Sequence, residues 1–123
     1  MSKKVLLVDD EDDIREVAQM SLEMVGGWDI VTANCGTKGL EVAAAEQPDA
    51  ILLDVMMPDM DGPTTFQKLQ ERDDTKHIPV ILLTAKVQAT DKERFEQLGV
   101  SGLIAKPFDP MTLAEEVSKR LGW

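Results

Sequence analysis

At 123 residues, the chain is long enough to form one domain with a buried core. Hydrophobic residues make up 43% of it, a proportion that argues against a disordered chain. The formal net charge of −10 argues against direct binding to nucleic acid or to anionic membranes, because both repel an acidic protein.

The first half of the chain alternates apolar runs with helical periodicity. The expected elements are an apolar strand from Val5 that ends at Asp9 and Asp10, a helix near 12–25, a strand near 28–32, a helix over 37–46 and a strand over 50–53. The buried face of the first helix is expected to carry Ile14, Val17, Ala18, Leu22 and Val25. Glycines at positions 26 and 27 are expected to end this helix.

The second half continues the same alternation. The expected elements are a helix from Pro63, a strand over 79–83, a helix from Thr90 to Gly99, a strand over 100–105 and a helix that follows Asp109 and Pro110. The spacing of Thr90 and Glu93 predicts a capping box. Phe95 and Leu98 are expected to face the core.

Five strand–helix units joined by short connections predict a parallel sheet with helices on both faces. In such a sheet, ligands bind at the carboxyl ends of the strands. The predicted strand ends carry Asp9, Asp10, Asp54, Thr84 and Lys106. Scattered structural residues would not fall there so regularly, so the pattern indicates a functional site.

The three aspartates of this set would repel one another unless a cation or a proton lay between them. A hard divalent cation with oxygen ligands is the simplest solution, and Mg²⁺ fits because it requires few protein carboxylates. A hydroxyl and an ammonium beside such a metal suit phosphoryl chemistry. For the neighbouring acids Glu11, Asp12 and Asp13, a solvated helix start is an equally good interpretation.

Cys35 is the only cysteine, so no internal disulfide can form and a reducing compartment is expected. The sequence has no apolar segment of membrane-spanning length, and its first residues lead directly into a strand pattern without a signal peptide. We therefore expect a cytoplasmic protein without membrane insertion.

Four segments, in this order and at these distances, resemble the receiver domain of bacterial two-component response regulators over nearly the whole chain. They are VDDE at 8–11, LDVMMPDMDG at 53–62, LTA at 83–85 and KPF at 106–108. The resemblance implies a flavodoxin-like (βα)5 doubly wound sheet with strand order 2-1-3-4-5. It also implies that residues 1–123 form one receiver domain without an output domain, either monomeric or weakly dimeric.

The resemblance implies a metal site in which Asp10 holds Mg²⁺ directly and Asp9 acts on it through water. Asp54 and the backbone carbonyl of Met56 complete the protein ligands. Mn²⁺ is a possible substitute for Mg²⁺.

The resemblance further implies that Asp54 accepts a phosphoryl group from a sensor histidine kinase or a phosphotransfer protein. Thr84 would contact that group, and Lys106 would pair first with the acceptor carboxylate and then with the phosphoryl group. The bond between Lys106 and Pro107 is commonly cis in this family. The protein would catalyse only its own phosphorylation and dephosphorylation, and its output would be a downstream effector protein.

One position departs from the family pattern. Receivers often carry an aromatic switch residue three positions before the lysine, and this chain has Leu103 there. The sequence therefore does not establish whether movement of Thr84 is coupled to position 103 in this chain. The main alternative is a receiver-fold binding module that works without phosphorylation. We also expect Met56 and Lys86 to line the entrance of the site and to influence the lifetime of the phosphorylated state.

Three other classes of protein fit these residues poorly. Aspartyl-phosphate phosphatases require a second acid where Met56 stands. A flavin site needs a hydroxyl- and glycine-rich loop where residues 9–13 are all acidic. A calcium-binding EF-hand would need acidic ligands in place of Met57 and Lys68.

Overall fold

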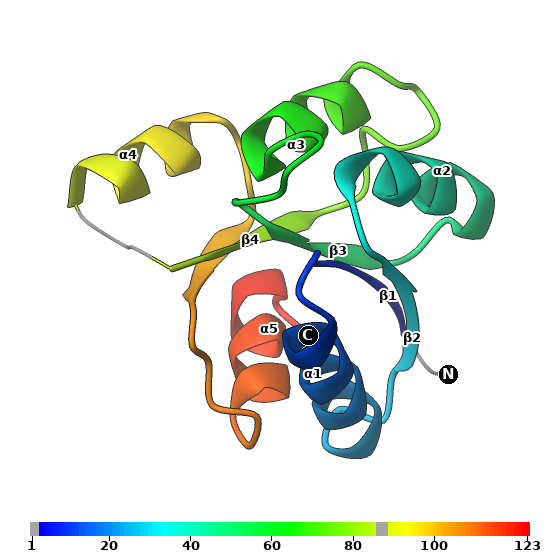
Figure 1. Ribbon diagram of the computed structural model, residues 1–123, viewed down its shortest axis with the longest axis vertical. Coiled ribbons are helices and arrows are strands. Elements are labelled where there is room, and N and C mark those ends of the chain that lie inside the picture. The colour runs from blue at the N-terminus through cyan, green and yellow to red at the C-terminus, as the bar shows by residue number, and fades with distance from the viewer. Residues whose placement is uncertain (1–2, 86–88) are drawn as a thin grey trace.

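The computed structural model of the protein describes residues 3–85 and 89–123. Across these ranges, five strands alternate with five helices (Figure 1). The strands are β1 (Lys4–Val8), β2 (Asp29–Ala33), β3 (Ala50–Asp54), β4 (Val80–Thr84) and β5 (Gly102–Ala105). The helices are α1 (Asp12–Met24), α2 (Gly36–Glu46), α3 (Gly62–Gln70), α4 (Ala89–Gln97) and α5 (Leu113–Leu121).

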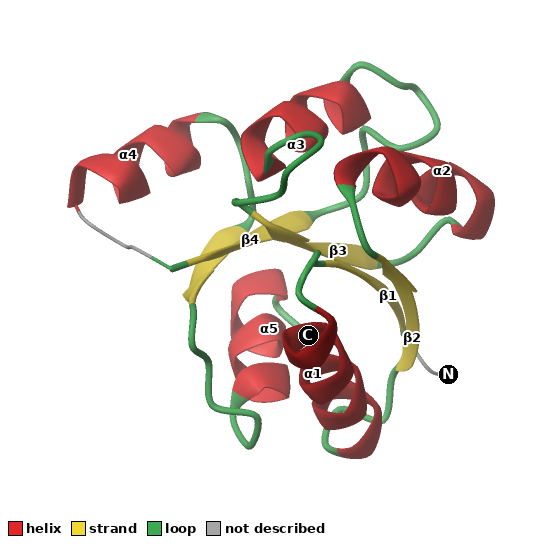
Figure 2. Cartoon of the chain, in the orientation of Figure 1, coloured by secondary structure: helices red, strands yellow, loops and turns green. Residues whose placement is uncertain are grey.

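The strands are all parallel and lie in the order β2-β1-β3-β4-β5. Helices α2, α3 and α4 cover one face of the sheet, and α1 and α5 cover the other (Figure 2). The predicted flavodoxin-like doubly wound fold is confirmed. Because the chain places β2 on one side of β1 and β3 on the other, the carboxyl ends of β1 and β3 form the switch point where such folds bind ligands.

Two hydrophobic clusters fix the helices to the sheet, because successive residues of a strand point to opposite faces. In β1, Leu6 and Val8 join the cluster that contains Phe66 of α3, whereas Val5 and Leu7 join the cluster on the face of α1 and α5. Every residue of β3 and β4 is buried, as expected for central strands that are covered on both faces.

The buried face of α1 is narrower than its periodicity predicts. Ala18 and Leu22 are fully buried, as predicted, but Val17 is 45% exposed and Val25 is 52% exposed. Ser21 occupies the buried face instead, and its hydroxyl donates a hydrogen bond to the carbonyl of Pro110 in the turn before α5. A polar contact to this turn therefore takes a position that apolar periodicity alone does not identify.

Helix α4 begins at Ala89, one residue before the predicted start. Phe95 is buried as predicted, but Leu98 is 43% exposed and the prediction that it faces the core is wrong. It lies beyond the last helical residue, in the turn that ends at Gly99 with a φ of 98°. The capping box predicted at Thr90 involves a side chain outside the described residues.

Two elements near the end of the chain begin later than predicted. Strand β5 begins at Gly102 and helix α5 at Leu113. Asp109 does form a cap, but of a separate turn before the helix: its Oδ1 accepts a hydrogen bond of 2.8 Å from the amide of Met111, and its carbonyl accepts one of 3.0 Å from Thr112. The predicted start of α5 at Pro110 is therefore wrong.

Candidate functional site

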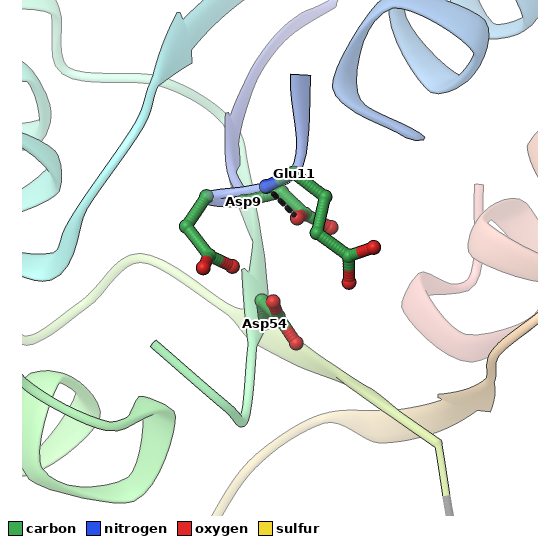
Figure 3. Close-up of side chains that lie close together, drawn as sticks. Asp9, Glu11 and Asp54 are labelled. Carbon is green, nitrogen blue, oxygen red and sulfur yellow. Dashed lines mark hydrogen bonds between the residues drawn. The ribbon is translucent and has the colours of Figure 1, made fainter. Parts of the chain in front are cut away.

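The ends of β1 and β3 place Asp9 and Asp54 at the same edge of the sheet. Val8 pairs with Leu53 in the parallel ladder, so the residues that follow them meet at the carboxyl end. Asp9 is fully buried and Asp54 is 2% exposed. Figure 3 shows their side chains close to that of Glu11. Carboxylate oxygens of four acids, these three and Asp10, lie within 4.8 Å of one another.

Lys106, which directly follows β5, brings a positive charge to these acids. Its Nζ lies 3.0 Å from Oδ2 of Asp9, 3.4 Å from Oε1 of Glu11 and 3.4 Å from Oδ2 of Asp54. Its backbone amide donates a hydrogen bond of 2.8 Å to the carbonyl of Thr84, and its peptide bond to Pro107 is cis, as the family resemblance implies. The hydrogen bond of the backbone amide and the ion pairs of the ammonium group therefore both fix the position of Lys106.

The protonation of Asp54 depends on competing effects. Burial and the nearby charge of Asp9 raise its pKa from 3.8 to about 6, against the opposing effects of Lys106 and of the Met56 amide. Burial acts to lower the pKa of Lys106, but the hydrogen bond with Asp9 and the surrounding acids outweigh it and raise that pKa. At neutral pH the site therefore holds an ionised Asp54 and a protonated lysine.

Two buried oxygens indicate that a cation fits this site. Within the described part of the chain, Oδ1 of Asp10 has no hydrogen-bond partner, and Oδ2 of Asp54 has no hydrogen bond but an ion-pair contact with the Lys106 ammonium at 3.4 Å. A buried polar atom without a partner is costly, and a hard divalent cation bound to both oxygens would remove that cost. The residues present therefore fit a magnesium-type ion with oxygen ligands.

The other predicted site residues differ in exposure. Thr84 is buried at the end of β4, whereas the side chain of Met56 is 73% exposed and lines a cleft of about 260 Å³ that also reaches Asp54 and Lys106. Lys86, the second predicted entrance residue, lies outside the described residues. Leu103 is 9% exposed and packs in the same cluster as Phe95 of α4.

Sequence reasoning did not assign two residues that the structure brings to the site. The sequence leaves Glu11 between a solvated helix start and the site, and its contact with Lys106 shows that it lies at the site. No motif in the sequence includes Arg15, yet its Nη1 donates a hydrogen bond of 2.8 Å to the backbone carbonyl of Asp9. Local spacing does not suggest this contact, because helical i,i+4 spacing relates Arg15 to Glu11 and not to Asp9.

The loop between β3 and α3 is fixed to the scaffold by short-range contacts. Asp61 accepts a hydrogen bond of 2.8 Å from the amide of Thr64 and so caps α3. Gly62 is required by close packing, because a Cβ there would lie 2.6 Å from the carbonyl oxygen of Asp54. Helix α3 therefore begins directly against the backbone of Asp54.

The same loop caps a second helix. Asp59 accepts hydrogen bonds from the amides of Gly36 and Thr37 at 3.2 and 3.1 Å, and from the hydroxyl of Thr37 at 3.0 Å. Burial acts to raise the pKa of Asp59, but these hydrogen bonds together lower it. The carboxylate therefore stabilises the fold above its unfolded pKa of 3.8, and this contribution is lost as the pH falls through the lower folded value.

The Asp59→Ala variant is expected to lower the free energy of unfolding by about 1 kcal/mol at neutral pH, because it removes the cap of α2. Denaturant unfolding at neutral and acidic pH checks this, and the loss should shrink as the pH falls below the unfolded pKa of 3.8. Asp73→Ala is the matched control, since the Asp73 side chain is 96% exposed. Equal losses in the two variants would contradict the capping role.

Comparison with known proteins gives one consistent result. A family model described as the response regulator receiver domain matches residues 5–118. The alkaline phosphatase synthesis transcriptional regulatory protein PhoP of Bacillus subtilis is 41% identical over 110 residues, which cover 89% of this chain and 45% of that protein. The master transcriptional regulator RpaA of Synechocystis is 40% identical over 106 residues, which cover 86% of this chain and 44% of that protein.

Two solved structures show the same fold. The chemotaxis response regulator CheY4 of Vibrio cholerae has a TM-score of 0.90 and 30% identity over 98% of this chain and 99% of that one. The receiver domain of the sensor histidine kinase PA1611 of Pseudomonas aeruginosa, which holds a magnesium ion in its active site cleft, has a TM-score of 0.86 and 26% identity over 100% of both chains.

The chain spans about half the length of the curated transcriptional regulators that it matches, 45% and 44% in the two cases above. Within the described ranges 3–85 and 89–123, none of the helices combines the length and the apolar character needed to cross a membrane.

Proposed function

The chain belongs to the family of response regulator receiver domains, the signalling modules of two-component systems, and from that membership we propose that it accepts a phosphoryl group on Asp54. The donor is a sensor histidine kinase or a phosphotransfer protein. Residues 1–123 act as one receiver unit, whose own phosphorylation and dephosphorylation are the only reactions assigned to it. Phosphorylation shifts the population between conformations of the domain and thereby changes a surface that a downstream protein recognises.

The observation that carries the proposal is the environment of Asp54. Asp54 is 2% exposed, and among the described residues its Oδ2 has no hydrogen-bond partner but an ion-pair contact with the Lys106 ammonium at 3.4 Å. An ionised carboxylate that is buried, unsaturated in hydrogen bonds and reached by an open cleft is suited to act as a nucleophile.

In the transfer step, a carboxylate oxygen of Asp54 forms a bond to phosphorus while the phosphorus–nitrogen bond of the donor phosphohistidine breaks. The Lys106 ammonium, now paired with Asp9, Glu11 and Asp54, is within reach of the new negative oxygens and offsets their charge. Thr84 supplies a hydroxyl at the neighbouring strand end. The buried carboxylate and lysine thus need little rearrangement.

Magnesium is the metal ion that this mechanism requires. Asp10, Asp54 and the carbonyl of Met56 would hold it, with Asp9 acting through water, and Mn²⁺ is a possible substitute. When bound, Mg²⁺ offsets the charge that the phosphoryl group brings to an acidic pocket. The unpartnered oxygens of Asp10 and Asp54 support this assignment, as does the magnesium ion in the PA1611 receiver domain.

Intact-mass spectrometry after incubation with a small-molecule phosphodonor tests the proposal. One phosphoryl adduct is expected in the presence of Mg²⁺, and none is expected with a chelator or in the Asp54→Ala variant. A binding module that works without phosphorylation is the second candidate, favoured by the aliphatic Leu103 at the switch position. A folded protein that gains no adduct under any of these conditions would support that second candidate instead.

A further inference from the structure

We propose that Glu11 supplies a fourth carboxylate to the cation site, in addition to the aspartates, and thereby strengthens the binding of Mg²⁺. This inference rests on the proposed function, because it concerns the same site. The resemblance to receiver domains implies no metal-binding role for position 11. An acidic residue at the start of a helix can also be explained simply as a solvent-exposed side chain that is favoured by the helix dipole.

The backbone places Glu11 at the site. Its amide donates a hydrogen bond of 2.9 Å to Oδ1 of Asp9, which folds the loop between β1 and α1 back over the strand end. The carboxylate of Asp9 is thus engaged on one side by this amide and on the other by Lys106 at 3.0 Å. The backbone of Glu11 is therefore fixed next to the fully buried Asp9.

The position of Lys106 shows that the carboxylate of Glu11 faces the site. The lysine ammonium lies 3.4 Å from Glu11 and 3.4 Å from Asp54, although these acids come from different elements. One cation is therefore already shared between Glu11 and the buried acids. A dication would attract the Glu11 carboxylate more strongly than the single charge of the lysine does.

An independent observation indicates that the site takes a ligand in addition to the lysine. Oδ2 of Asp54 is buried and has no hydrogen-bond partner among residues 3–85 and 89–123, despite the nearby ammonium. Oδ1 of Asp10 is in the same condition. Lys106 thus reaches Oδ2 of Asp54 only at 3.4 Å and leaves Oδ1 of Asp10 without a partner. Of the other two carboxylates within 4.8 Å of these acids, that of Asp9 already binds the Glu11 amide and Lys106, which makes Glu11 the additional candidate ligand.

The test is calorimetric titration of the full chain with Mg²⁺ alone at about 0.1 M salt, where charges more than about 10 Å apart are largely screened. Glu11→Gln is expected to weaken Mg²⁺ binding about fivefold, because a carboxylate close to a dication is lost. The side chain of Glu11 is 57% exposed, so the variant should fold normally, and thermal unfolding verifies this.

Glu16→Gln is the matched control, since it makes the same chemical change at an exposed position of α1 and should leave the Mg²⁺ affinity within twofold of the parent. The inference is overturned if Glu11→Gln binds Mg²⁺ like the parent or if both variants weaken it equally. Asp10→Asn separates this result from a failure of the proposed function. If that variant retains the parent affinity, the proposed metal site is itself wrong, whereas loss of binding in Asp10→Asn alone rejects only the role of Glu11.

Discussion

The Asp54→Asn variant should be more stable than the parent in the absence of metal, although it removes the proposed phosphoryl acceptor. The pKa of Asp54 is raised from 3.8 to about 6, so the folded protein binds a proton in that range more tightly than the unfolded chain does. Stability is consequently lost as the pH rises from about 4 to about 6. The neutral amide avoids this cost, and the gain should be on the order of 2–3 kcal/mol at about pH 8.

Denaturant unfolding with a chelator present, at about pH 8 and at about pH 4, measures this effect. The gain should nearly vanish at the lower pH, where Asp54 of the folded parent is protonated. Asp59→Ala provides a control of opposite sign, because the pKa of Asp59 is lowered and its removal should cost stability at about pH 8. An Asp54→Asn variant that is no more stable than the parent at the higher pH would show that burial does not destabilise the ionised acceptor.

Lys106→Met should have the opposite effect on stability. The lysine side chain is 8% exposed and compensates Asp9 and Asp54, whose side chains are 0% and 4% exposed. Removal of one partner from a buried ion pair leaves uncompensated charge, and we expect a loss of about 3 kcal/mol at neutral pH without metal. Saturating Mg²⁺ should recover part of this loss, because it restores positive charge beside the acids.

Lys76→Met is the matched control for this variant. Lys76 pairs with Asp73 on the surface, where the two side chains are 57% and 96% exposed, and such pairs contribute less than about 1 kcal/mol. Phosphoryl uptake should also fall in Lys106→Met, since the pKa of Asp54 rises further and fewer acceptors are ionised at neutral pH. Equal stability of Lys106→Met and Lys76→Met would contradict the buried role of the lysine.

The sequence predicts the fold and the convergence of the acids and the lysine because both depend on simple patterns. Strands β3 and β4 are short, mostly apolar runs, as burial on both faces of the sheet favours. The acids and the lysine could be placed together because the carboxyl ends of parallel strands converge at the switch point.

The features that the sequence does not predict depend on individual contacts. Periodicity places Val17 on the apolar face of α1, but α1 presents Ser21 to the turn at Pro110 and leaves Val17 45% exposed. The position of Glu11 depends on a hydrogen bond of its amide to Asp9. Asp59 lies in the loop before α3 but caps α2. This contact joins two segments that are distant in the sequence, so no local pattern specifies it.

Identification of the phosphorylated residue tests the central claim most directly. After reaction with the phosphodonor and Mg²⁺, borohydride reduction converts an aspartyl phosphate to homoserine, which peptide mass spectrometry can locate. Homoserine is expected at position 54 and at no other aspartate of the chain. Homoserine at Asp9 or Asp10, or an adduct that persists in Asp54→Ala, would contradict the assignment of Asp54 as the acceptor.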